Sequence, residues 1–314
     1  MAEILTSAQI EDGRIGDSVV SIGVFDGVHI GHQKVIESLQ KAKVESGANV
    51  SVLMTFDRHP LSVTHPERQP RLLTTLKEKL SILSELDVDI ILVEEFTSAL
   101  AAIDYRDFIE TRLLRRLGMK HLVIGYDFHL GRGREGNQQN IAAEGKKTGY
   151  GFSVVSPVVV RGRAVSSTRI RKNIEARKLH VAARLLTRPY FFDADVVHGE
   201  GIGRELKFPT ANATVSHSEK LLPPTGVYAV NVETPSGISG GMMNVGAAPT
   251  IRHDGVERIE VHLFDFDGNL YGERIRICCL DYLREEKEFD GRDELRAQLK
   301  RDRDCVRSIL EKKY

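Results

Sequence analysis

The chain has 314 residues, which exceeds a typical single domain of roughly 100–200 residues and predicts two domains. With 41% hydrophobic and 28% charged residues, it has the composition of an ordinary globular protein. Lys plus Arg and Asp plus Glu both total 44, so no net charge attracts the chain to nucleic acid or to a membrane surface. Residues 1–14 lack the basic and apolar regions of a signal peptide, and no run of about 18 apolar residues follows. We therefore expect a cytoplasmic protein with no membrane or nucleic-acid partner.

The first half of the chain alternates short apolar runs with amphipathic stretches. Runs rich in Val and Ile predict strands at residues 18–25, 49–56, 88–96 and 121–128. A helix is predicted over 32–47, ending at Gly47, because four apolar residues share one face: Val35, Ile36, Leu39 and Ala42. Strand and helix in alternation imply parallel pairing through right-handed crossovers. We expect an open, doubly wound α/β sheet of the Rossmann-like kind in residues 1–186.

The second half has a different pattern. Residues 166–186 predict two short helices, and from Thr187 to Tyr282 strand-like runs are separated by Gly, Pro, Asn and Asp without a helical segment. This pattern is typical of an antiparallel β-barrel. A C-terminal helix that packs on the barrel is predicted from apolar residues at helical spacing: Leu295, Leu299, Val306, Ile309 and Leu310. The second domain is therefore expected to cover residues 187–314.

The stretch "SIGVFDGVHIGH", residues 21–32, joins the first predicted strand to the first helix. Ligands of open α/β sheets bind beyond the carboxyl ends of the strands, where helices begin. Gly23, Gly27 and Gly31 allow a close approach of the backbone. His29 and His32 lie one turn apart at the helix start, where imidazoles can donate hydrogen bonds to phosphate oxygens. A glycine turn with two surface histidines explains this motif equally well.

Three further motifs belong to the same predicted edge of the sheet. "TFDRHP" (55–60) and "GYDFHLGRGREG" (125–136) each follow a predicted strand directly. "SSTRIR" (166–171) places three hydroxyls and an arginine at a helix start, where they suit an anionic phosphate chain. On its own, this last motif is more often a capped basic helix.

In this order, the four motifs resemble the adenylyltransferase module of the bacterial bifunctional riboflavin kinase/FAD synthetases, members of the HxGH nucleotidyltransferase superfamily. The resemblance implies that His29, His32 and Arg169 act on the phosphates of ATP during AMP transfer to FMN. It also implies a set of ATP-binding residues: Gly23, Phe25, Asp26, Gly27, Gly31, Ser166, Ser167 and Thr168. The flavin side is implied to include His59, Asp127 and Phe128.

This sequence departs from the family pattern on the flavin side. The family more often has proline where Arg58 stands, and arginine followed by phenylalanine where His129 and Leu130 stand. The resemblance therefore specifies the ATP side of the site more closely than the flavin side.

The segment "HGEGIGRELKFPTAN", residues 198–212, is the main candidate in the second half. Spaced glycines and basic residues can wrap a phosphate chain, and here they are Gly199, Gly201, Gly203, Arg204 and Lys207. Thr210 and Asn212 are two apart, so both point to one face of an extended chain and offer the oxygen ligands that Mg²⁺ prefers. A glycine-rich hairpin with an Asx turn is the alternative, and without further context it is favoured.

Further motifs supply that context. "RPY", "TGVYAV", "NVGAAPT" and "IEVHLFDF" surround the segment in an order that resembles the riboflavin kinase module of the same family. The resemblance implies that Glu260 is the catalytic base, which accepts the proton of the ribityl hydroxyl as this attacks the γ-phosphate. Taken alone, Glu260 between Ile259 and Val261 is typical of a solvent-facing strand carboxylate. Lys207 and Thr187 stand where the family usually has glycine.

The sequence thus predicts one chain with two active sites. The barrel is expected to phosphorylate riboflavin to FMN, and the α/β domain to convert FMN to FAD, each with ATP as co-substrate and Mg²⁺. Two alternative functions remain. One is a nucleotidyltransferase whose barrel only binds flavin, and the other is a flavin-sensing regulator that binds DNA. The combination of "PTAN" with Glu260 disfavours the first, and the neutral charge disfavours the second. The oligomeric state stays open.

Overall fold

The computed structural model describes residues 2–198, 208–246 and 258–312. Its contacts divide the chain into two compact units, Met1–Ser167 and Thr168–Tyr314. The two short helices that precede the barrel are grouped with the barrel by these contacts. The boundary predicted from the sequence, between Leu186 and Thr187, separates two sets of motifs and stays a prediction for the functional modules.

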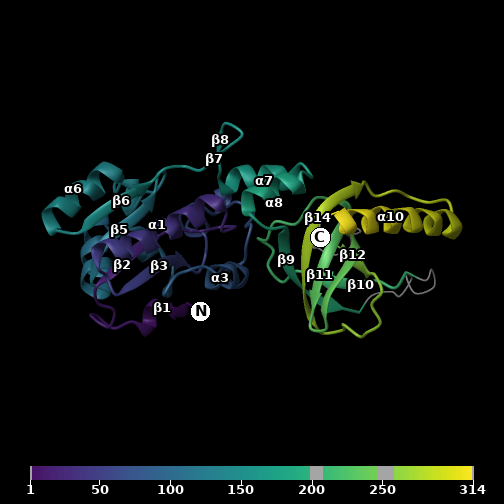
Figure 1. Ribbon diagram of the computed structural model, residues 1–314, viewed down its shortest axis with the longest axis horizontal. Coiled ribbons are helices and arrows are strands. Elements are labelled where there is room, and N and C mark those ends of the chain that lie inside the picture. The colour runs from purple at the N-terminus through teal and green to yellow at the C-terminus, as the bar shows by residue number, and fades with distance from the viewer. Residues whose placement is uncertain (1, 199–207, 247–257, 313–314) are drawn as a thin grey trace. The chain divides into compact units, whose positions relative to one another are not determined.

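The first unit is built on a six-stranded parallel sheet with the order β1-β4-β3-β2-β5-β6 (Figure 1). Its strands are β1 (Glu3–Thr6), β2 (Ser18–Ile22), β3 (Val50–Phe56), β4 (Ile90–Glu94), β5 (Met119–Gly125) and β6 (Gly151–Val155). From β2 the chain proceeds outward to β3 and β4 and then returns to β5 on the other side of β2. This order confirms the doubly wound sheet and places its switch point between β2 and β5, where ligands of such sheets bind.

Helices cover both faces of this sheet. They are α1 (Ile30–Ser46), α2 (Leu61–Thr64), α3 (Leu76–Ser84), α4 (Ser98–Ala101), α5 (Tyr105–Phe108) and α6 (Gln138–Thr148). Shorter turns are η1 (Ser7–Gln9), η2 (Pro66–Arg68), the π-helical η3 (Ile109–Arg115) and η4 (Arg132–Arg134), and a small hairpin pairs β7 (Val159–Val160) with β8 (Arg163–Ala164). The prediction for α1 is confirmed: its four expected residues are buried, and the helix ends at Gly47 with a φ of 64°.

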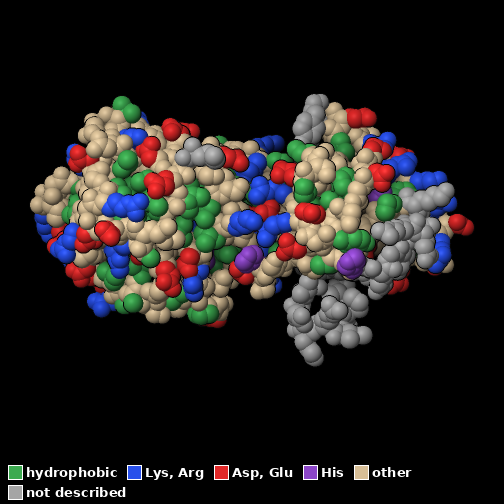
Figure 2. Space-filling view, turned by 90° about the horizontal axis from the view of Figure 1, so that it is seen from below, with side chains coloured by type: hydrophobic (Ala, Val, Ile, Leu, Met, Phe, Trp, Pro, Cys, Tyr) green, Lys and Arg blue, Asp and Glu red, His purple; other side chains and the backbone are tan. Residues whose placement is uncertain are grey.

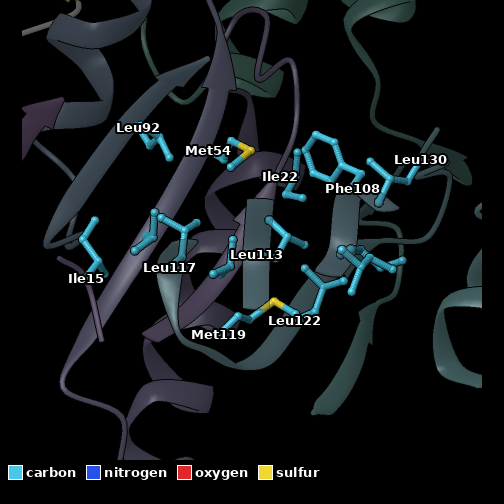
Figure 3. Close-up of a cluster of buried hydrophobic side chains, with 14 of the residues drawn as sticks. Ile15, Ile22, Met54, Leu92, Phe108, Leu113, Leu117, Met119, Leu122 and Leu130 are labelled. Carbon is cyan, nitrogen blue, oxygen red and sulfur yellow. The ribbon is translucent and has the colours of Figure 1, made fainter. Parts of the chain in front are cut away.

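The main core of this unit lies on one face of the sheet (Figure 3). Alternate residues of the central strands, Ile22, Met54, Leu92 and Leu122, pack with side chains from α5, η3 and the turn that follows, Phe108, Leu113 and Leu117. The buried residues of α1 lie outside this cluster, so α1 packs on the opposite face, against β2, β3 and β5. Each large apolar side chain buried in this way contributes about 1.5–3 kcal/mol to stability.

The second unit begins with α7 (Ser167–Glu175) and α8 (Leu179–Leu186), the two helices predicted before the barrel. A closed antiparallel barrel follows in the order β10-β13-β12-β11-β14-β9. Its strands are β9 (Tyr190–Val197), β10 (Ala211–Thr214), β11 (Gly226–Thr234), β12 (Gly237–Gly246), β13 (Arg258–Leu263) and β14 (Arg274–Arg284). Closure removes the unpaired strand edges that an open sheet would present.

The predicted C-terminal helix is also present, as α10 (Arg292–Lys312). Val306 is fully buried in a cluster with Phe208, Met242 and Leu280, while Leu299, Ile309 and Leu310 pack at its margin. Leu295, the fifth predicted residue, is half-buried. The helix therefore covers the outside of the barrel, as the spacing of its apolar residues predicted.

Acidic and basic side chains are interspersed over the face of the first unit that Figure 2 shows. In the three described ranges, we find no helix with the length and apolar character needed to cross a membrane.

Candidate active sites

The turn between β2 and α1 has an unusual backbone. Phe25, Gly27 and Val28 have φ values of 52°, 80° and 41°. Positive φ destabilises glycine little. For a β-branched residue such as Val28 it is a strained conformation that costs about 1–3 kcal/mol. A strained turn persists only where the surrounding structure holds it, and such turns concentrate at functional sites.

Asp26 anchors this turn to the segment before α3. Its buried carboxylate accepts hydrogen bonds from the backbone N–H groups of Leu73 and Thr74, at 3.2 and 3.0 Å. The Thr74 hydroxyl in turn accepts from the N–H of Gly27 at 3.0 Å. From the far end of the unit, the Ser167 hydroxyl donates to the carbonyl of Asp26 at 2.9 Å. Asp26 therefore stabilises the turn, and its predicted role in ATP binding stays a prediction.

His29 and His32 form a stacked pair at the start of α1. Their ring centroids lie 3.6 Å apart with the planes inclined by 17°. Nδ1 of His29 accepts a hydrogen bond from the N–H of His32 at 3.3 Å and caps the helix. The proton of neutral His29 is therefore on Nε2, where it can be donated to a ligand. Because His29 is only 5% exposed, it is not the surface histidine of the alternative interpretation.

Aromatic packing and two glycines fix this pair. The ring of Phe25 meets His32 edge to face, with centroids 5.3 Å apart. A Cβ at Gly23 would lie 2.9 Å from the Phe25 ring, and a Cβ at Gly31 would lie 3.1 Å from Cε1 of His29. These two predicted ATP-binding glycines therefore make room for aromatic side chains of the site.

The predicted flavin residues lie in the loops that follow the strands next to β2, at the same carboxyl edge of the sheet. His59 follows β3, and its Nδ1 accepts from the N–H of Leu61 at 3.1 Å. Asp127 and Phe128 follow β5, and Phe128 packs against the main core. Since β3 and β5 flank β2, the three strand-end loops share one edge of the sheet, as predicted.

The residues that depart from the family pattern each have defined neighbours in this region. Arg58 donates to the carboxylate of Asp57 at 2.9 Å. His129 forms a 2.9 Å hydrogen bond with Arg134, and Leu130 is buried with 7% exposure. The guanidinium of Arg134 thus lies beside the position where the family usually has arginine.

Asp57 connects the loops after β3 and β4. Its Oδ1 accepts from the N–H of Phe96 at 2.8 Å, and the Phe96 ring meets Phe56 edge to face. Burial raises the pKa of Asp57, but the hydrogen bonds from Arg58 and Phe96 outweigh that effect and leave the net pKa below its usual value. The carboxylate is therefore charged at neutral pH.

Lys79, on α3, was not predicted as part of the site. Its side chain is 6% exposed, and Nζ donates to the carbonyls of Val24 and Phe56 and to the hydroxyl of Thr55 at 2.9–3.1 Å. Burial lowers its pKa to about 8, although Asp26 and Asp57 act in the opposite direction. In the sequence "TTLKEKL" this lysine is indistinguishable from a solvated one, because its acceptors are far away in the chain.

The residues of "SSTRIR" are divided between the two units. Ser166 and Ser167 end the first unit, and Ser167 contacts the β2–α1 turn through the carbonyl of Asp26. Thr168 and Arg169 belong to the second unit, on the first turn of α7, where the Arg169 carbonyl accepts from Asn173 at 2.7 Å. The clamp that Thr168 and Arg169 are expected to form on ATP stays a prediction.

In the barrel, three polar residues lie in a row on neighbouring strands. Glu260 of β13 is directly opposite Asn212 of β10 and directly opposite Asn244 of β12. Directly opposed residues of antiparallel strands project to the same face of the sheet. Asn244, which was not predicted, also donates to Glu286 at 2.9 Å. Thr210 is half-buried immediately before β10.

His262 fixes the "PTAN" segment to β13. One of its ring nitrogens, Nδ1, lies 2.8 Å from the carbonyl of Pro209 and is therefore the protonated nitrogen. Burial lowers the pKa of His262, which keeps the ring neutral near pH 7. The predicted phosphate-wrapping residues of the barrel, Gly199, Gly201, Gly203, Arg204 and Lys207, lie outside the described residues.

Comparison with known proteins covers both units. The family model described as FAD synthetase matches residues 13–169, and the one described as riboflavin kinase matches residues 186–310. A bifunctional riboflavin kinase/FMN adenylyltransferase of Bacillus subtilis is 35% identical, with 91% of this chain and 90% of the relative covered. The protein of the same name from Escherichia coli K12 is 36% identical, with 93% and 92% covered.

A solved structure is similar over nearly the whole chain as well. It is described as a macrolide-efflux protein from Streptococcus pneumoniae, is 30% identical, and has a TM-score of 0.85 with 96% of each chain covered.

Proposed function

The chain belongs to the bifunctional riboflavin kinase/FMN adenylyltransferase family, and from this membership we infer which residues carry each of its two reactions. The C-terminal domain phosphorylates riboflavin to FMN, and the N-terminal domain transfers AMP to FMN to give FAD. ATP is the co-substrate of both reactions.

We propose that FAD forms at the β2–α1 turn. A phosphate oxygen of FMN attacks the α-phosphorus of ATP, the bond to the β-phosphate breaks, and pyrophosphate leaves. The observation that carries this proposal is the stacked pair of His29 and His32 at a helix start. His29 can donate from Nε2 to a phosphate oxygen, and the positive end of the helix dipole stabilises the negative charge that develops. Arg169 is proposed to supply a further positive charge.

We propose that FMN forms in the barrel, at the row of Asn212, Glu260 and Asn244. Glu260 accepts the proton of the ribityl hydroxyl, and the oxygen then attacks the γ-phosphorus of ATP while ADP leaves. The register of the strands supports this role, because Glu260 and Asn212 project to the same face of the barrel.

The oxygen donors of the "PTAN" segment suit a magnesium ion. The Thr210 hydroxyl and the Asn212 amide oxygen are hard ligands, and we propose that they hold Mg²⁺ on the phosphates of ATP. When bound, the ion would neutralise part of the phosphate charge.

We also propose a cytoplasmic location, where ATP is available, and no nucleic-acid partner.

Two single substitutions test this division. His29→Ala should suppress FAD formation from FMN by about 100-fold or more, because it removes a donor to the transferred phosphate. Riboflavin phosphorylation should persist. Glu260→Ala should have the reverse effect. His65→Ala and Glu273→Ala, which change exposed residues of the same types in the same units, should leave both rates unchanged. Chromatography separates riboflavin, FMN and FAD. If either single change removed both activities from a folded chain, the two-site assignment would be wrong.

A further inference from the structure

We propose that Lys79 is a positioning residue of the adenylyltransferase site: its ammonium group ties the histidine turn after β2 to the flavin-side loop after β3. The inference rests on the proposed function, because it assigns AMP transfer to that turn. Lys79 lies on α3, outside every motif that the sequence analysis used.

The three acceptors of Lys79 belong to the two segments that have to be aligned. Val24 is in the turn that leads to His29, and its carbonyl accepts at 3.1 Å. Thr55 and Phe56 end β3, directly before the loop with His59, and both accept at 2.9 Å. An ammonium group has three N–H donors, and each meets one acceptor here. The Thr55 hydroxyl also donates to the carbonyl of Val24 at 3.3 Å, which closes the network.

The helix that carries Lys79 is itself held against the turn. The residues just before α3, Leu73 and Thr74, donate to the Asp26 carboxylate. A capping box between Thr75 and Glu78 then fixes the first turn of the helix. Because the segment before α3 contacts the turn at Asp26 and Lys79 of α3 contacts it at Val24, a displacement of Lys79 would move both ends of the segment that precedes the histidines.

The charge of Lys79 provides a distinctive signature. Burial lowers its pKa to about 8, and the charged groups that oppose this shift are Asp26 in the turn and Asp57 directly after β3. Above this pH the neutral amine has two N–H donors, so one of the three hydrogen bonds is lost. FAD formation should therefore decline above about pH 8.

This decline would not reflect unfolding caused by Lys79. Its pKa in the folded chain is lower than the ordinary value of 10.5, so between about 8 and 10.5 the unfolded chain binds more protons at this group. In that window the contribution of Lys79 to the free energy of unfolding rises with pH. A loss of activity with retained stability separates positioning from a purely structural role.

The test compares Lys79→Met, Lys79→Arg and Lys77→Met with the unchanged chain, from below to above pH 8, with FMN, ATP and Mg²⁺. Lys77→Met is the matched control, because Lys77 is exposed on the same helix. Lys79→Met should lower kcat for FAD formation by about 100-fold, as misalignment at a catalytic site does, and should abolish the alkaline decline. Lys79→Arg keeps its charge, so its remaining rate should not decline above pH 8. Riboflavin phosphorylation should be unchanged in all variants.

A Lys79→Met chain with the unchanged rate, or with the alkaline decline intact, would overturn the proposal. If Lys79→Met does not fold, as judged by its thermal transition, the pH dependence of FAD formation by the unchanged chain tests the proposal instead. An FAD-forming rate that stays level through pH 8 then overturns the proposal, and a decline confined to that reaction supports it. His29→Ala separates this outcome from failure of the proposed function. If His29→Ala abolishes FAD formation and Lys79→Met does not, only the role of Lys79 is wrong.

Discussion

Single residues of the β2–α1 turn are packed so closely that small additions of volume should affect the chemistry. The stacked histidines, the Phe25 ring and the two glycines beside them form one contact network. An HxGH pattern with a glycine between the histidines could be recognised in the sequence. The reason for that glycine could not, because it depends on the position of the His29 ring.

Gly31→Ala tests this packing. In an ordinary helix this change stabilises by about 1 kcal/mol. Here the new methyl group would lie 3.1 Å from Cε1 of His29 and would push the imidazole by a few tenths of an ångström. We expect the rate of FAD formation to fall about tenfold with riboflavin phosphorylation unchanged. Gly16→Ala, whose Cβ would meet no atom within 4 Å, is the control. Equal rates for the two variants would show that the close contact has no role.

At the scale of elements, the attachment of α10 to the barrel depends on a partly buried ion pair as well as on apolar packing. Arg284, at the end of β14, donates to both carboxylate oxygens of Asp302 on α10, at 2.8–3.2 Å. Asp302 is only 5% exposed. The spacing of leucines predicted the helix and its packing face, but the buried aspartate resembles the exposed charges around it in the sequence.

Removal of this carboxylate should destabilise the second unit. Asp302→Ala leaves the Arg284 guanidinium partly buried without its partner, and we expect a loss of about 2–3 kcal/mol in the free energy of unfolding. Asp304→Ala breaks an exposed pair with Arg303 on the same helix and should cost less than about 0.5 kcal/mol. Denaturant unfolding of the two variants measures the difference. Losses of equal size would contradict a specific anchor at Asp302.

The strands show which elements can be read from a sequence. The four predicted strands of the sheet are confirmed as β2, β3, β4 and β5, because long Val- and Ile-rich runs mark strands buried on both faces. The two outer strands were missed. β1 has four residues with only Leu5 buried, and β6 is at best half-buried, so neither has a continuous apolar run.

At the scale of the whole molecule, the motifs of the two reactions follow one another along the chain, with "SSTRIR" divided between the two units, and their order could be read without a structure. Local patterns singled out His29, His32 and Asn212 as candidates, and the resemblance to a known family added Glu260; their roles stay predictions. Contacts between residues distant in the sequence could not be read in this way. Lys79 meets acceptors 23 to 55 residues away, and Asn244 meets Glu286 42 residues away. Such partners are specified by the sheet and the barrel rather than by neighbours in the chain.

The most direct test of two independent sites in one chain mixes two variants that each lack one of the two activities. His29→Ala alone should convert riboflavin to FMN and stop there, and Glu260→Ala alone should leave riboflavin unchanged. With riboflavin, ATP and Mg²⁺, the mixture should accumulate FMN and then FAD, because the product of one variant is the substrate of the other. Absence of FAD from the mixture, while each variant remains folded and active in its single reaction, would contradict the account.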